Sequence, residues 1–174
     1  RLVAARTMAG LFSGISIVLA DRTTLSVIQA NPRAALERAV FEVLPGTVRL
    51  ERLVWDGAAL TAGSAGQGAL AESIFAGYGE GDHLLGYAVP GAGAGFADTI
   101  KLIYGLDPAG DRVLGMKVLE SRETPGLGDK IYKDLEFVGE FRELVVDPLI
   151  ELIKGHGEKP YQVDAITGAT ISSR

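Results

Sequence analysis

The chain contains 174 residues, of which 47% are hydrophobic and 22% are charged. Because this apolar content is enough for one packed core, we expect a folded domain and not a disordered segment. The formal net charge of −5 and the lack of a basic stripe exclude nucleic acid as a partner, since phosphate backbones bind to basic surfaces. The absence of cysteine excludes disulfides, thiolate metal sites, iron–sulfur clusters and a cysteine nucleophile.

An uncharged, mostly apolar run, residues 7–20, follows Arg1 and Arg6 near the start of the chain. It is shorter than the roughly 20 residues that a membrane crossing takes. A second uncharged run, 23–30, lets one helix cover both if the charged pair between them lies at an interface. We therefore expect a membrane-anchor helix over residues 1–30, with the two arginines on the cytoplasmic side. A cleaved signal peptide and a buried core helix are the alternatives.

The next segments predict one helix followed by a sheet. Asn31-Pro32 is a typical helix start, apolar residues recur at helical spacing up to Leu44, and Pro45-Gly46 ends the pattern. The periodicity then changes to that of strands. Strands are predicted over residues 48–55, 73–78, 84–89, 98–106 and 112–120. The short turns between them, rich in Asp and Gly, imply antiparallel pairing.

The last third of the chain mixes loops and short elements. A Gly-rich loop, residues 124–128, precedes an amphipathic pattern over 133–144 that predicts a helix. The remainder predicts a strand, a polar turn and the start of a helix. The expected fold class is α+β, with a mostly antiparallel sheet and packed helices, preceded by the anchor helix. Residues 31–174 would form one domain. The chain begins with Arg and stops without a closing element, so we expect both ends to have been trimmed.

The glycine-alanine run 91–95 invites comparison with a nucleotide-binding loop. Its spacing fails, because the third glycine of a dinucleotide fingerprint would fall at Phe96 and the flanking segments are strand-like. The run instead predicts a flexible turn where backbone approaches another group closely.

Other catalytic patterns are missing from the sequence. The two histidines, His83 and His156, lie in separate polar turns without a carboxylate at metal-ligand spacing, which predicts solvated side chains. There is no Gly-x-Ser-x-Gly elbow and no Ser/His/Asp trio, so hydrolase chemistry has no nucleophile.

Two segments are harder to explain by packing alone. The first joins a strand to a helix through Pro and two glycines, a loop whose backbone N–H groups can bind an anionic or planar ligand. Its candidate binding residues are Glu123, Thr124, Gly126, Leu127, Gly128 and Lys130. The second gathers small residues and hydroxyls at a helix start, where free N–H groups favour a phosphate. Its candidates are Asp164, Thr167, Gly168, Ala169, Thr170, Ile171 and Ser172.

Taken together, the segments GYA…GAGFADTIKL, VLESRETPGLGDKI, FVGEF and VDAITGATISSR resemble the FMN-binding domain family. Its best-known members are the G subunit of the Rnf electron-transport complex and the C subunit of the sodium-pumping NADH:quinone oxidoreductase. The similarity spans residues 31–174. The most specific motif is Asp-x-x-Thr-Gly-Ala-Thr, which a flavin transferase reads in this family before it attaches FMN to the last Thr, here Thr170. The run 123–128 matches the family's second signature, which lies against the flavin.

The resemblance implies covalent FMN, joined by a phosphoester to Thr170. It implies an electron-transfer subunit in a membrane-bound, ion-translocating Rnf-type oxidoreductase complex acting between ferredoxin and NAD, with no substrate site of its own. A Thr hydroxyl without a nearby His or Lys is a poor self-activated nucleophile, which suits a tether made by a separate enzyme.

The implied partners are other membrane subunits, membrane lipid and the flavin transferase. The implied location is the bacterial inner membrane, single-pass, with the FMN domain on the periplasmic side. Two alternatives stay open, namely a stand-alone periplasmic FMN-binding redox or regulatory domain and a cofactor-free extracytoplasmic binding module.

Overall fold

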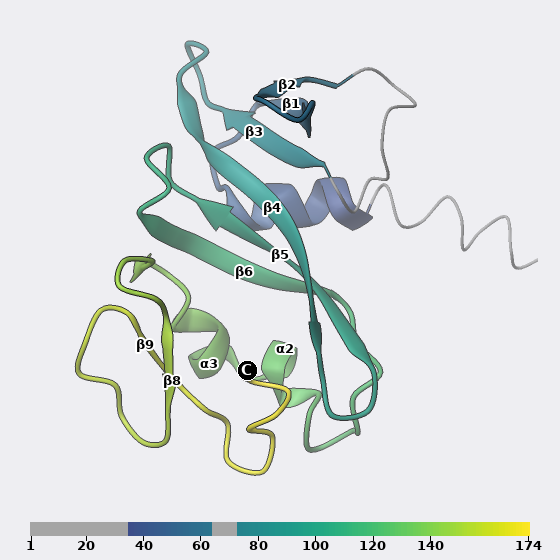
Figure 1. Ribbon diagram of the computed structural model, residues 1–174, viewed down its shortest axis with the longest axis vertical. Helices are drawn as coiled ribbons and strands as arrows, with labels where there is room; N and C mark the ends of the chain where they lie inside the picture. Colours follow the sequence, from purple (N-terminus) through teal and green to yellow (C-terminus); the bar gives the residue numbers. More distant parts are fainter. Residues whose placement is uncertain (1–34, 64–72) are drawn as a thin grey trace, which may run out of the picture. The chain divides into compact units, whose positions relative to one another are not determined.

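The computed structural model describes residues 35–63 and 73–174. The expected anchor helix over residues 1–30 lies outside them. The chain divides into two units, Arg1–Leu36 and Glu37–Arg174, and the second contains all the strands described below (Figure 1). Within the described part of the chain, no helix is long and apolar enough to cross a membrane.

A seven-stranded antiparallel sheet forms the framework of the second unit, in the order β2-β1-β3-β4-β5-β6-β7. Its strands are β1 (Arg49–Trp55), β2 (Leu60–Ala62), β3 (Ile74–Tyr78), β4 (Leu84–Ala94), β5 (Thr99–Leu106), β6 (Arg112–Glu120) and β7 (Leu144–Val145). Two short strands, β8 (Glu151–Ile153) and β9 (Gln162–Asp164), pair in parallel. The prediction of a mostly antiparallel sheet is confirmed.

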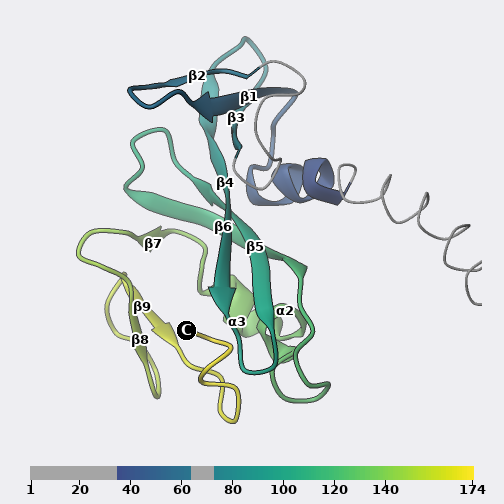
Figure 2. The same cartoon turned by 45° about the vertical axis from the view of Figure 1, so that its right-hand side comes forward.

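The hairpin of β4 and β5 is longer than its sequence suggests. The glycine-alanine run predicted as a turn belongs largely to β4, which pairs with β5 from Tyr87↔Leu106 to Ala94↔Thr99. That prediction is wrong because the partner strand, rich in β-branched and aromatic residues, supplies a complete backbone ladder for residues with little preference of their own. The turn is 95–98, where the Gly95 N–H donates to the Asp98 carbonyl over 3.0 Å. Figures 1 and 2 show this tip at the lower end of the two strands.

The helix predicted over residues 133–144 is confirmed only over residues 135–139. Two short helices, α2 (Lys130–Lys133) and α3 (Leu135–Gly139), flank Asp134, whose backbone is extended. The Asp134 carboxylate accepts hydrogen bonds from the N–H groups of Glu136 and Phe137, because Asp favours capping a helix over continuing one. The last residue of the predicted helix, Leu144, pairs in β7 with Val113 of β6.

Side chains alternate between the two faces of the sheet along β5. On one face, Leu102, Tyr104 and Leu106 pack against a buried cluster that includes Ile131 of α2 and Phe137 of α3. On the other face, Ile103 is fully buried. The sheet thus has apolar residues on both sides, and the cluster beside α2 and α3 is the one that supports the site described below.

A row of glycines crosses the other face of the sheet. Gly77 pairs with Gly86, and Gly105 pairs with Gly115 on the neighbouring strands. The helix 35–43 ends over this row, and a methyl group added at Gly105 would fall against the carbonyl oxygen of Val43. The absence of side chains lets the helix end approach closely, which buries Val43 and the following Leu44 almost completely. Where it is described, the predicted helix ending near Leu44 is confirmed.

Candidate functional site

Three segments far apart in sequence meet at one cavity. They are the hairpin tip 95–98, the loop that follows β6, and the C-terminal segment. Both views place the C-terminal segment beside α2 and α3 (Figures 1 and 2). The cavity has a volume of about 320 Å³. Its lining residues are Phe96, Glu123, Thr124, Leu127, Gly128, Gly168, Ala169, Thr170, Ile171 and Ser172.

A buried carboxylate, that of Asp129, stabilises the loop after β6. Asp129 accepts hydrogen bonds from the Gly126 N–H over 2.7 Å and from the Lys133 ammonium group over 2.6 Å. The Lys133 ammonium group, and after it the Gly126 N–H, lower the pKa of Asp129 below its ordinary value. Gly126 has a left-handed backbone (φ +80°), which a side chain would strain. The resulting turn leaves Leu127 half exposed at the cavity.

The C-terminal segment places Thr170 between two anchors. Gly168 turns the chain with φ +83°, and the buried side chains of Ile166 and Ala169 fix the segment to the core. The Ser173 N–H donates to the Ala169 carbonyl over 3.0 Å, so the end of the chain makes a helical turn where a helix start was predicted. Thr170 is exposed, so its side chain is accessible from solvent.

Nine of the thirteen predicted binding residues line this cavity. The four that do not are Gly126, Lys130, Asp164 and Thr167. Sequence reasoning missed Phe96, which is 72% exposed at the hairpin tip. An aromatic residue in a Gly-rich turn is a weak signal that could have marked it, but its place beside Thr170 depends on the sheet register.

Asp164 faces a different, polar cavity of about 440 Å³. Its carboxylate accepts from the Gly157 N–H over 2.8 Å and lies 3.2 Å from the Nδ1 atom of His156. Its backbone N–H donates to Glu140 over 2.6 Å. The Asp164 side chain thus binds the turn before β9 and does not line the cavity at Thr170.

We expect Glu140→Gln to leave the domain as stable at pH 7, or slightly more stable. Desolvation raises the pKa of Glu140, and the negative charges of Asp164, Glu136 and Asp134 raise it further. A carboxyl whose pKa is higher in the folded state destabilises the fold as pH rises through that pKa. Gln keeps an oxygen that accepts from Asp164 and removes the charge. Urea unfolding at pH 4 and pH 7 measures the effect, with Glu136→Gln as the exposed control. A clear loss of stability at pH 7 in Glu140→Gln alone would contradict this assignment.

The cavity at Thr170 has a largely apolar lining. Phe96, Leu127 and Ile171 present exposed apolar surface around it. Gly168 and Ala169 leave room next to Thr170, where a larger side chain would obstruct a bulky substituent. The one charged lining residue, Glu123, has its carboxylate engaged by protein hydrogen bonds.

Residues 95–174, which contain the whole cavity, match the model of the FMN-binding domain family. This match over the last 80 residues confirms the resemblance seen in the motifs. The threonine hydroxyl, small residues and apolar rim of the cavity fit a flavin.

The chain is also similar to subunits of oxidoreductase complexes. The chain is 33% identical over 95 residues to the G subunit of the proton-translocating ferredoxin:NAD(+) oxidoreductase complex of Clostridium ljungdahlii, covering 55% of this chain and 49% of that protein. It is 42% identical over 85 residues to the G subunit of the ion-translocating oxidoreductase complex of Shewanella piezotolerans, covering 46% and 38%. The matches thus span less than half the length of these relatives.

The fold is shared with a solved structure. The crystal structure of NqrC from Shewanella oneidensis superposes with a TM-score of 0.64 at 18% identity, covering 82% of this chain and 87% of that one. This likeness supports the antiparallel architecture and extends it well beyond the segment matched by the family.

Proposed function

We propose that this domain holds one FMN, joined through its phosphate to Thr170, and carries electrons on it. The observation that supports the linkage is the exposed Thr170 at the edge of a cavity that lies entirely within the family segment. When bound, FMN supplies the redox chemistry, and the protein holds and orients it.

The chain's own residues then have distinct roles. Phe96, Leu127 and Ile171 provide apolar surface for the ring, and Thr124 lies beside them in the cavity wall. Gly168 and Ala169 leave space around Thr170 for the phosphate. The four proposed residues outside the lining act indirectly. Asp164 and Thr167 belong to the sequence that a flavin transferase reads, Gly126 shapes the loop, and Lys130 begins the helix behind it.

For the whole protein, we propose an electron-transfer role within a membrane-bound, ion-translocating oxidoreductase complex of the Rnf type, acting between ferredoxin and NAD. The names of the relatives support this role. Its partners would be other membrane subunits of the complex, a flavin transferase and membrane lipid. A helix over residues 1–30 would anchor the FMN domain, residues 31–174, on the periplasmic side of the bacterial inner membrane.

Intact mass of the chain, produced with and without a flavin transferase, tests the proposed function. We expect the mass of one FMN less one water, only in the presence of the transferase. Flavin that is released by denaturation would contradict the linkage. A colourless, unmodified chain would favour a cofactor-free binding module. Purification of the native protein then separates a member of a complex, which brings membrane partners with it, from a stand-alone flavin domain.

The proposed orientation predicts the behaviour of reporter fusions placed after Arg174. Arginines on the cytoplasmic side of an apolar run keep that side in the cytoplasm. Alkaline phosphatase, which folds outside the cytoplasm, is expected to be active in the fusion, and a cytoplasm-dependent fluorescent protein is expected to be dark. The reverse pattern would contradict the orientation, and a fusion found in the cytosol after lysis would contradict the anchor. A fusion to residues 31–174 alone is the control.

A further inference from the structure

We propose that Glu123 is a positioning residue that holds the hairpin tip and the C-terminal segment together on either side of the FMN site, and that it acts through Ala97, Asp98 and Ser172. This inference rests on the proposed function for its consequence, but its geometry can be tested without any flavin.

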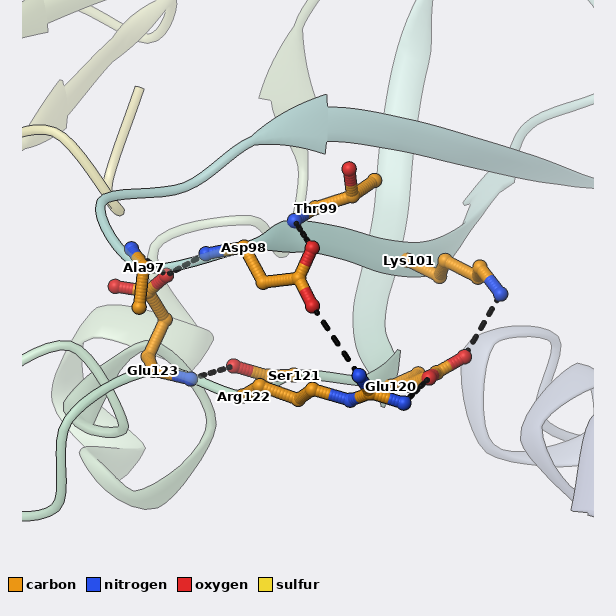
Figure 3. A network of polar contacts seen from close by, with 8 residues as sticks. All are labelled: Ala97, Asp98, Thr99, Lys101, Glu120, Ser121, Arg122 and Glu123. Carbon is orange, nitrogen blue, oxygen red and sulfur yellow. Dashed lines mark hydrogen bonds and ion pairs between the residues drawn. The ribbon is translucent and has the colours of Figure 1, made fainter.

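The Glu123 carboxylate joins three separate segments of the chain. Its Oε1 atom accepts hydrogen bonds from the Ala97 N–H over 2.9 Å and the Asp98 N–H over 3.4 Å. Its Oε2 atom accepts from the Ser172 hydroxyl over 2.6 Å. Figure 3 shows the side chain reaching from the loop after β6 to the hairpin tip. One side chain thus connects the tip of the β4–β5 hairpin, its own loop and the end of the chain.

The Glu123 carboxylate is closely packed on several sides. Glu123 is only 6% exposed. A Cβ atom added to Gly95 would fall against its Oε1 atom, and one added to Gly128 would fall against its Oε2 atom and lie 2.9 Å from the Ser172 hydroxyl. Glycine at these two positions is what allows the hairpin and the loop to close on the carboxylate.

Neighbouring charges on the same stretch of chain are arranged differently. Glu120 pairs with Lys101 over 2.8 Å and with Arg122 over 3.8 Å, and all three side chains are exposed (Figure 3). Exposed ion pairs of this kind contribute little, because water and salt screen them. Glu123 is therefore distinguished by its burial and by its backbone partners, and Glu120 is its matched control.

The partners of Glu123 are adjacent to the groups that form the site. Ala97 follows Phe96, and Ser172 lies two residues after Thr170, so the carboxylate fixes one residue on each side of the cavity. Hydrogen bonds from the Ser172 hydroxyl, and then from the Ala97 N–H, lower the pKa of Glu123. The charged form is thus the one that the site favours. Because the folded-state pKa is depressed, the stabilisation is present above the ordinary pKa of about 4.3 and is lost as pH falls below it.

The experiment compares Glu123→Ala, Glu123→Gln and Ser172→Ala with Glu120→Ala. The first measurement is amide hydrogen exchange over the hairpin tip in the flavin-free chain. We expect Glu123→Ala to speed exchange at the tip by about tenfold or more, since it leaves the Ala97 and Asp98 N–H groups without their acceptor. Gln retains an acceptor oxygen and should stay close to the wild type. Ser172→Ala and Glu120→Ala should leave the tip unchanged.

The second measurement is the rate of flavin attachment and the midpoint potential of the attached flavin. Glu123→Ala is expected to slow attachment by about tenfold and to shift the potential, because Phe96 and Thr170 are then no longer held in place by hydrogen bonds to one carboxylate. Ser172→Ala should reduce attachment less, since it releases only the C-terminal segment and leaves the hairpin tip bound to Glu123. Glu123→Gln should largely retain attachment.

Each outcome bears on the inference separately from the proposed function. Exchange at the tip that is equal in Glu123→Ala and Glu120→Ala would overturn the positioning role. Faster exchange with unchanged attachment and potential would reduce Glu123 to a structural residue and also overturn it. If Glu123→Ala does not fold, Ser172→Ala, which removes a single hydrogen bond, tests in its place whether Glu123 positions the C-terminal segment. A wild-type chain that takes no flavin contradicts the proposed function, while the exchange result still decides whether Glu123 holds the hairpin tip.

Discussion

Thr170→Ala is expected to abolish covalent flavin while leaving the domain folded. The linkage needs the hydroxyl oxygen, which Ala lacks, so no attachment can occur at this position. Losing one exposed hydroxyl in a terminal turn costs at most about 1 kcal/mol. Thr170→Ser keeps the oxygen and should retain part of the attachment. Fluorescence of the denatured protein in a gel and the mass of the peptide containing residue 170 measure both effects.

Thr124→Ala is the matched control for this variant. Thr124 is an exposed threonine that lines the same cavity but lies outside the Thr-Gly-Ala-Thr sequence. Its loss should leave attachment intact. Covalent flavin in Thr170→Ala, or a modified peptide that contains Thr124 or Thr167, would refute the assignment of the tether.

Gly105→Ala is expected to destabilise the domain by about 1–3 kcal/mol, the usual cost of adding an atom to a well-packed core. The new methyl group would fall against the carbonyl oxygen of Val43 and would lie 3.1 Å from the Leu44 side chain. Backbone at the end of the helix 35–43 would have to move away from the sheet to relieve this contact. The buried residues Val43 and Leu44 would then lose part of their packing.

Gly93→Ala is the control for Gly105→Ala, because Gly93 also lies in a paired strand but has open space where its Cβ would be. Urea unfolding of both variants and the wild type, followed by circular dichroism, measures the difference. Equal midpoints for the two variants would show that the helix end does not sit on the glycine row as described.

Local sequence patterns were enough to predict much of the sheet. Strands at residues 73–78 and 112–120, and the helix ending near Leu44, follow from the spacing of apolar residues and from turn residues next to them. The pattern failed where partners elsewhere in the chain outweighed local preference. β5 draws the glycine-alanine run into an extended strand, and Asp134 divides an amphipathic segment into α2 and α3 by capping the second helix.

By itself, the sequence determined the order of the motifs, the resemblance to the FMN-binding domain family and the candidate residue Thr170, because these depend only on residue types at short spacings. Tertiary structure alone decided which candidates share a cavity. Phe96 joins Thr170 through the register of β4 and β5, and Asp164 turns away to Gly157. Glu123 meets Ser172, 49 residues further on, only once the hairpin, loop and chain end have packed. Contacts at such separations depend on how whole elements fold together, and no local pattern records them.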